Sequence, residues 1–169
     1  MCDPGARGTV TILAVASLLT VSCGGGVAGY SPVRSPSPTL GPSTSNALQV
    51  CVDQTNQYRA SVGRPALALD AALARYADLA ARNDGTFHVG HQYFRRTRGG
   101  GIAHAENEIP WWPLNDFRTI DDLVLAGLSE MWREGRRGGH YRNMIGPYAR
   151  LGCGIFVNGN EVTVVQAFR

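Results

Sequence analysis

A sharp change in composition near residue 45 sets the limit on what this chain can fold into. Pro, Ser, Thr and Gly recur at close intervals before that point, whereas regularly spaced apolar residues follow it to the end of the chain. A Pro/Ser/Gly-rich segment buries too little apolar surface to offset the entropy lost on ordering. We therefore predict one folded domain over residues 46–169, preceded by a linker over residues 23–45.

The first 22 residues have the pattern of an export signal. Arg7 precedes an apolar run over residues 9–21, which is long enough for a signal-peptide core but short for a membrane span. The run leads into Leu-Thr-Val-Ser-Cys at residues 19–23, which resembles a bacterial lipobox, where a peptidase cuts before Cys and the thiol receives lipid. We predict a signal peptide over residues 1–22, lipidation of Cys23 and anchoring on the outer face of the cytoplasmic membrane or cell envelope. The alternative is plain secretion without a lipid on Cys23.

Cysteine usage follows from the same interpretation. Lipidation of Cys23 would leave Cys51 and Cys153 as the remaining pair of the processed chain. Export places both in an oxidising compartment, where a disulfide closing a loop of about 100 residues contributes about 4–5 kcal/mol. We predict this disulfide, with two buried free thiols as the alternative. No Cys-x-x-Cys spacing is present, so a cysteine zinc site is not expected.

Apolar periodicity within the domain predicts helices first and strands last. The predicted helices cover residues 46–60, 70–83, 119–135 and 140–145. Apolar residues alternate over 151–168 around the turn Asn158-Gly159-Asn160, which predicts a hairpin. One further strand is expected within residues 100–112, inside an otherwise irregular stretch over 86–117. Helices followed by strands predict an α+β fold with helices packed on an antiparallel sheet.

Four short motifs in a fixed order carry a family resemblance. They are Asn56-Gln57-Tyr58-Arg59, then Ala105-Glu106-Asn107, then Met131-Trp132-Arg133-Glu134, and last Gly139-His140-Tyr141-Arg142-Asn143-Met144 with Leu151-Gly152-Cys153-Gly154. Together they resemble the CAP superfamily, the module of cysteine-rich secretory and pathogenesis-related proteins. The resemblance covers about residues 47–169. It implies a three-layer α-β-α sandwich around a small antiparallel sheet.

The same resemblance implies a cleft that holds two His and two Glu. Glu106, Glu134 and His140 match motif positions, and the first His is His91, with His88 as the alternative. Glu134 also fits a surface acid at a helix end. In some family members the His pair binds zinc or another divalent ion, so His91 and His140 are the expected metal ligands. Neutral imidazole and carboxylate suit such ions, and they also pass protons near neutral pH.

Three functions fit this set of residues. The first is a non-catalytic module that binds a lipid or sterol-like ligand, a cell-wall component or a partner protein. The second is a structural envelope lipoprotein, and the third a metal-dependent, peptidase-like hydrolase. The enzyme ranks last because no signature in the sequence requires hydrolysis. In addition, no nucleophile has a base nearby in the sequence, and Gly99-Gly100-Gly101 lacks the Lys and Ser/Thr of a phosphate loop. A net charge of +3 is too small to indicate a nucleic-acid partner, and we expect a monomer.

Overall fold

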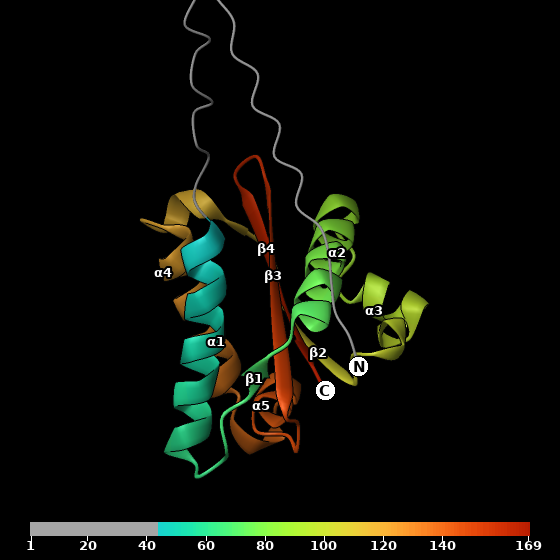
Figure 1. Ribbon diagram of the computed structural model, residues 1–169. Coiled ribbons are helices and arrows are strands. Elements are labelled where there is room, and N and C mark those ends of the chain that lie inside the picture. The colour runs from blue at the N-terminus through green and yellow to red at the C-terminus, as the bar shows by residue number, and fades with distance from the viewer. Residues whose placement is uncertain (1–43) are drawn as a thin grey trace, which may run out of the picture. The chain divides into compact units, whose positions relative to one another are not determined.

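The computed structural model describes residues 44–169 as a sheet between two layers of helices. Figure 1 views the sheet nearly edge-on, with α1 and α4 on one side and α2 and α3 on the other. The helices are α1 (Thr44–Ser61), α2 (Ala71–Phe87), α3 (Gln92–Thr97), α4 (Ile120–Arg133) and α5 (Gly139–Met144). Three short 3-10 turns lie at η1 (Gly99–Gly101), η2 (Leu114–Asp116) and η3 (Gly135–Arg137). The predicted signal peptide, Cys23 and residues 24–43 of the linker lie outside the described residues.

The sheet has four strands in the order β1-β3-β4-β2. The strands are β1 (Ala68–Leu69), β2 (Ala105–Pro113), β3 (Arg150–Asn158) and β4 (Glu161–Phe168). β2, β4 and β3 pair antiparallel, whereas the short β1 runs parallel to the start of β3, so the sheet is mixed at this edge. The predicted α+β sandwich is therefore confirmed, with one parallel pair added. Among residues 44–169, no helix is long and apolar enough to span a membrane.

Both faces of the hairpin are buried, since helices cover the sheet on each side. Large apolar residues of β3 and β4 face α1 and α4, where they join one core cluster; they include Leu151, Ile155, Val162, Val164 and Phe168. The intervening residues face α2, where Val165 and Ala167 join a second cluster. The period-2 alternation that predicts the hairpin thus separates two cores rather than a core and solvent.

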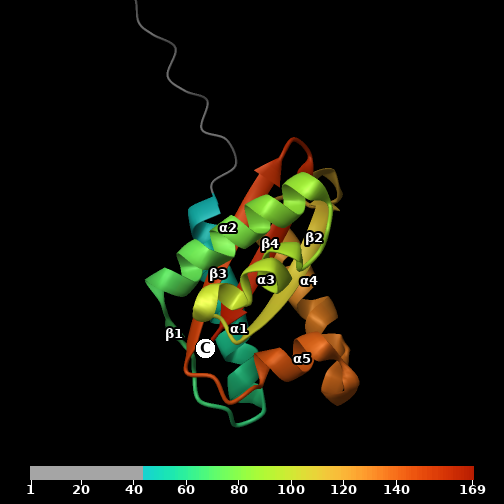
Figure 2. The same ribbon diagram turned by 90° about the vertical axis from the view of Figure 1, so that its right-hand side faces the viewer.

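Two glycines of β3 allow α2 to lie directly on the sheet. A methyl group on Gly152 would collide with the backbone at Leu73 and Ala74, and one on Gly154 would collide with the backbone at Ala77. Figure 2 shows α2 and α3 in front of the sheet on this side. The small residues are therefore needed for close helix-to-sheet approach rather than for backbone freedom.

The predicted end of the second helix at Asn83 is wrong. α2 continues to Phe87, and the left-handed His88 at its end donates its backbone N–H to Asp84. The Asn-Asp-Gly sequence, typical of a turn, lies inside the helix because Gly85 is needed for packing. A Cβ there would stand 2.6 Å from Thr163 Oγ1 and 2.9 Å from Phe156 Cδ1.

The stretch predicted as irregular over residues 86–117 contains a short helix. α3 covers Gln92–Thr97, and the left-handed His91 stands at its start. The expected strand is β2, which extends to Pro113 and carries an irregularity between Ile109 and Trp112. Periodicity gives little signal for a six-residue helix, which explains why the sequence pattern did not predict it.

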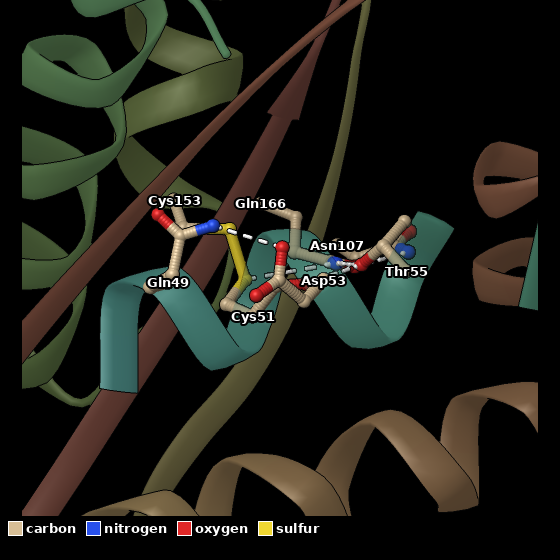
Figure 3. The surroundings of a disulfide bond; sticks show 7 residues. All are labelled: Gln49, Cys51, Asp53, Thr55, Asn107, Cys153 and Gln166. Atoms are coloured by element: carbon tan, nitrogen blue, oxygen red, sulfur yellow. Dashed lines mark hydrogen bonds between the residues drawn. A yellow bond between two sulfur atoms is a disulfide. The ribbon is translucent and has the colours of Figure 1, made fainter. Parts of the chain in front are cut away.

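A disulfide joins Cys51 of α1 to Cys153 of β3, which are 102 positions apart in the sequence. This is the predicted pair. Figure 3 shows Gln166 beside the sulfur atoms and in line with Thr55. The Gln166 amide donates to Thr55 Oγ1 at 2.6 Å and lies 3.8 Å from Cys51 Sγ. The disulfide therefore joins α1 to β3 beside the buried, hydrogen-bonded side chains of Gln166 and Thr55.

The first sequence motif has a structural role. Arg59 is 1% exposed and donates hydrogen bonds to four carbonyl groups, those of Pro65, Met144, Gly146 and Tyr148. Asn56 exchanges two hydrogen bonds with the backbone of Leu67. Tyr58 stacks on Trp132 at 4.6 Å between ring centroids. The motif therefore closes the end of α1 against the loops that follow α1 and α5.

Candidate functional site

Two alternate residues of β2 direct carboxylates at His91. Glu106 and Glu108 lie on the same face of the strand because side chains repeat every second residue. Glu106 Oε1 accepts a hydrogen bond from His91 Nδ1 at 2.8 Å. Glu108 Oε2 accepts the backbone N–H of His91 at 2.6 Å and lies 3.6 Å from Nδ1. Both glutamates are buried, whereas the His91 side chain is 38% exposed.

The backbone of His91 is left-handed, with φ of 56°. This conformation is uncommon for a residue other than Gly. The hydrogen bond from its N–H to Glu108 stabilises it and fixes the start of α3 against β2. The loop between α2 and β2 thus presents the imidazole at one defined place.

A second His–Glu pair stands on the opposite side of the group, between the end of α4 and the start of α5. His140 Nδ1 lies 2.6 Å from Glu134 Oε1, and its backbone N–H donates to Glu134 Oε2 at 3.1 Å. The rings of His91 and His140 face each other with centroids 6.4 Å apart and planes tilted by 30°. The structure therefore brings the four predicted residues together, and we call this set with Glu108 the His/Glu group.

The alternative His88 lies apart from this pair of rings. Its Nε2 is 2.7 Å from Glu161 Oε2 at the start of β4, and both side chains are exposed. The ring also contacts the edge of Trp111 at 5.2 Å between centroids. His88 therefore belongs to the hairpin end, whereas His91 faces His140.

Burial controls the electrostatics of the inner residues. It raises the pKa of Glu106 above its usual range, and it raises the pKa of Glu108 to about 7. The pKa of His91 is raised as well, chiefly by its hydrogen bond to Glu106. Each of these groups therefore holds a proton to higher pH than it would in water.

Sequence reasoning missed two acids at this place, Glu108 and Asp84. Asp84 is fully buried in α2, and its Oδ1 accepts the backbone N–H of Tyr93 at 2.9 Å. Its charge raises the pKa values of both Glu106 and Glu108. The Glu-x-Glu spacing in β2 signals Glu108 once the strand is placed, but nothing in the local sequence signals Asp84.

A series of hydrogen-bonded side-chain amides connects the segment that carries Glu106 with the segment that carries His140. Asn107 donates to the His140 carbonyl at 3.2 Å and to Gln166 Oε1 at 3.0 Å. Asn143 donates to the Glu106 carbonyl at 3.0 Å and to Asn107 Oδ1 at 2.9 Å. These bonds connect β2 with α5, so the motif asparagines position the backbones that carry Glu106 and His140.

The donor atoms present fit a divalent cation. One atom from each of His91, Glu106 and Glu108 lies within 4.8 Å of the others. In addition, both His–Glu pairs use Nδ1, which leaves Nε2 of each ring for a ligand. A carboxylate on the far nitrogen is the usual way in which proteins orient a metal-binding His.

A separate hollow of about 490 Å³ lies between α1 and α2 along β3. Leu48, Leu79 and Ile155 are among the apolar residues that line it. It includes none of the His/Glu group, and it is lined by no imidazole and by a single carboxylate, that of Asp78, which lies beside Arg75. We therefore place the candidate site at the His/Glu group.

Comparison with solved structures shows the same fold at low identity. "NaASP2 with Zn2+" matches with a TM-score of 0.54 and 17% identity, covering 78% of this chain and 82% of that one. Na-ASP-1 matches with a TM-score of 0.52 and 15% identity, covering 78% of this chain and 40% of that one. A cysteine-rich secretory protein from Staphylococcus aureus subsp. aureus Mu50 matches with a TM-score of 0.48 and 16% identity, covering 73% of this chain. This chain spans only 38% of the length of the staphylococcal protein.

Comparison with curated proteins found no match. The family model described as "CAP: Cysteine-rich secretory protein family" matches residues 52–168, which is more than half of the chain and nearly all of the described part. The chain belongs to the cysteine-rich secretory protein (CAP) family.

Proposed function

We propose that the protein is an exported, envelope-anchored CAP module that binds its ligand at the His/Glu group without catalysing a reaction. A divalent cation, with zinc as the first candidate, binds Nε2 of His91 and His140. The observation that carries this proposal is the facing pair of rings, 6.4 Å apart, each with Nδ1 already bonded to a glutamate. The family resemblance to "NaASP2 with Zn2+" supports the choice of metal.

The ligand classes that fit an anchored module are a lipid or sterol-like molecule, a wall component or a partner protein. The disulfide supports export, because such bonds persist in oxidising compartments. The apolar run before Cys23 supports anchoring through lipid on that residue. Cys23→Ser is expected to move the protein from the membrane fraction to the medium, and an unchanged membrane fraction would contradict the anchor.

Calorimetric titration of the full-length protein with zinc tests the metal site. We expect one saturable site in the wild type and an affinity lower by at least about tenfold in His91→Ala and in His140→Ala. His88→Ala is the matched control, since His88 pairs with Glu161 instead, and its affinity should equal that of the wild type. A folded wild type that binds no zinc, or equal binding in all four proteins, would overturn the proposal.

A metal-dependent hydrolase is the second candidate, and one observation favours it. Glu108 has a pKa of about 7, which suits a general base working near neutral pH. Its carboxylate lies 3.6 Å from Nδ1 of His91. Hydrolysis of model peptides or esters that requires both zinc and Glu108 would support this candidate over the binding module.

A further inference from the structure

Three buried carboxylates meet behind His91, and each has an oxygen without a hydrogen-bond partner. The unpartnered atoms are Asp84 Oδ2, Glu106 Oε2 and Glu108 Oε1. The side chains of Glu106 and Glu108 are only 1% and 2% exposed, and Asp84 is fully buried. Buried polar oxygens of native proteins are nearly always bonded to a partner, so three orphans at one place indicate a missing one.

The surrounding charges do not supply that partner. α2 contributes Asp84, β2 contributes Glu106 and Glu108, and α3 contributes Arg95 after the loop residue His91. Arg95 acts on Glu106 only as the weakest of the effects on its pKa. Among the described residues, His91 is the basic group that bonds to Glu106 and Glu108, and Arg95 acts on Glu106 without a hydrogen bond or ion pair to it.

The separations around His91 Nδ1 are those of neighbouring ligands on one cation. Two ligands at right angles, each about 2.1 Å from a divalent ion, lie about 3 Å apart. Nδ1 lies 2.8 Å from Glu106 Oε1 and 3.6 Å from Glu108 Oε2, and the orphan atoms are the other oxygens of these two carboxylates. One donor atom of each of the three residues falls within 4.8 Å of the others. A cation would take the place of the proton that Nδ1 now donates to Glu106.

We propose that His91 Nδ1, Glu106 and Glu108 form a second cation site that takes a hard divalent ion of the Mn²⁺ class, with Asp84 as an outer carboxylate. Two carboxylates favour Mg²⁺, Ca²⁺ and Mn²⁺ over softer metals, and the single imidazole favours Mn²⁺ among these. This site uses the Nδ1 edge of His91, whereas zinc in the proposed function uses the Nε2 edge with His140. A neutral imidazole binds a metal through one nitrogen only, so the two ions compete for His91, and each site is tested with one metal alone.

Gly90 lies beside the carboxylate of Glu108. A Cβ on Gly90 would lie 3.4 Å from Glu108 Oε2 and 4.0 Å from Trp111 Cη2. The residue before His91 therefore places no side chain against this carboxylate, which is itself only 2% exposed.

Mn²⁺ binding to the full-length protein tests the site, followed by the loss of the free-ion signal in electron paramagnetic resonance. We expect one bound Mn²⁺ in the wild type. Glu108→Gln is expected to weaken binding by at least about tenfold, because the amide is a poorer ligand. The fold should survive, since the Gln side-chain oxygen still accepts the backbone N–H of His91. Glu130→Gln is the matched control, because Glu130 is an exposed acid paired with Arg133.

His140→Ala separates this inference from the proposed function. We expect it to change Mn²⁺ affinity by less than about threefold, while it weakens zinc binding by at least about tenfold. Glu108→Gln should weaken Mn²⁺ binding by at least about tenfold and change zinc affinity by less than about threefold. The melting temperature in chelator gives a second readout. Glu108→Gln removes a buried acid that has one oxygen without a partner, so we expect the variant to melt at a higher temperature than the wild type. The further rise that Mn²⁺ gives in the wild type should be absent from the variant.

Absence of Mn²⁺ binding by the folded wild type, or Mn²⁺ affinity that falls in His140→Ala but not in Glu108→Gln, would overturn the second site. Either result would leave the zinc proposal standing if zinc still requires His91 and His140. Failure of zinc binding with intact, Glu108-dependent Mn²⁺ binding would instead overturn the proposed function alone.

Discussion

His91 and His140 make the same contact with a glutamate in different surroundings. Their Nδ1 atoms lie 2.8 Å and 2.6 Å from Glu106 and Glu134. The Glu106 side chain is 1% exposed and comes from the edge strand β2, whereas the Glu134 side chain is 34% exposed and comes from a helix end. The distance alone therefore does not give the strength of each ion pair. Solvent screens the charge of Glu134, whereas the charge of Glu106 is buried and is screened much less.

The inner pair also has neighbours that the outer pair lacks. Glu108 and Asp84 place two more buried acids near Glu106, and burial raises the pKa of both glutamates. Glu134 instead uses its two oxygens on the same residue, His140. The inner half of the His/Glu group, His91 with Glu106 and Glu108, therefore holds buried acids whose pKa values are raised. The outer half, His140 with Glu134, is partly exposed to solvent, and Glu134 accepts a backbone N–H at the start of α5.

Breaking the connection between the two halves should have the largest effect. Asn107→Leu removes the amide that bonds to the His140 carbonyl, Gln166 and Asn143, and it leaves the buried Gln166 oxygen without a partner. We expect the free energy of unfolding to fall by about 3 kcal/mol, measured by urea denaturation. Gln49→Leu, an exposed amide with one bond to Asp53, is the control and should change stability by less than about 0.5 kcal/mol. A loss below about 1 kcal/mol in Asn107→Leu would show that the chain of amides adds little.

The inner half should also make the metal-free protein less stable as pH rises. The folded-state pKa values of Glu106, Glu108 and His91 all lie above their ordinary values, so the folded state binds more protons than the unfolded state. The contribution of Glu108 is complete below about pH 4.5 and is lost as pH rises through about 7, which amounts to about 3 kcal/mol. The contributions of Glu106 and His91 are lost in the same direction, that of His91 only above its ordinary pKa of 6.5. Asp70, whose pKa is lowered by hydrogen bonds to Leu73 and other groups, titrates below this window.

Urea denaturation in chelator at pH 5, 6, 7 and 8 measures this slope. Glu108→Gln is expected to flatten it, since the amide does not titrate. A free energy of unfolding that rises from pH 5 to pH 8 in the wild type would contradict the electrostatic contrast between the two halves.

The smallest effect is expected from the outer pair. Glu134→Gln removes a charge that is one-third exposed, and the amide oxygen can still accept the backbone N–H of His140. Stability should fall by less than about 1 kcal/mol, on the scale of a surface ion pair. Thermal unfolding beside Glu130→Gln measures this difference, and a loss of more than about 2 kcal/mol would place Glu134 on a level with the buried acids.

The sequence predicted the α+β sandwich, the order of its elements and the cysteine pair. Apolar spacing located α1, α4, α5 and the hairpin to within a few residues, because these signals repeat inside one element. The motifs also pointed to His91, Glu106, Glu134 and His140, which the fold brings to one place. The choice of His91 over His88 rested on resemblance, and only the pairing of His88 with Glu161 shows why the two differ.

Contacts between distant segments decided the rest. The sequence Asn83-Asp84-Gly85 predicts a turn, yet these residues continue α2. The glycine serves packing there, because it allows the helix to lie close to Thr163 and Phe156. Glu108 and Asp84 are ordinary acids in the sequence, and they become a buried cluster only where β2, α2 and the His91 loop converge. Local spacing determines which face of an element is apolar, whereas burial and charge at a point depend on which elements pack there, and that information exists only in the tertiary structure.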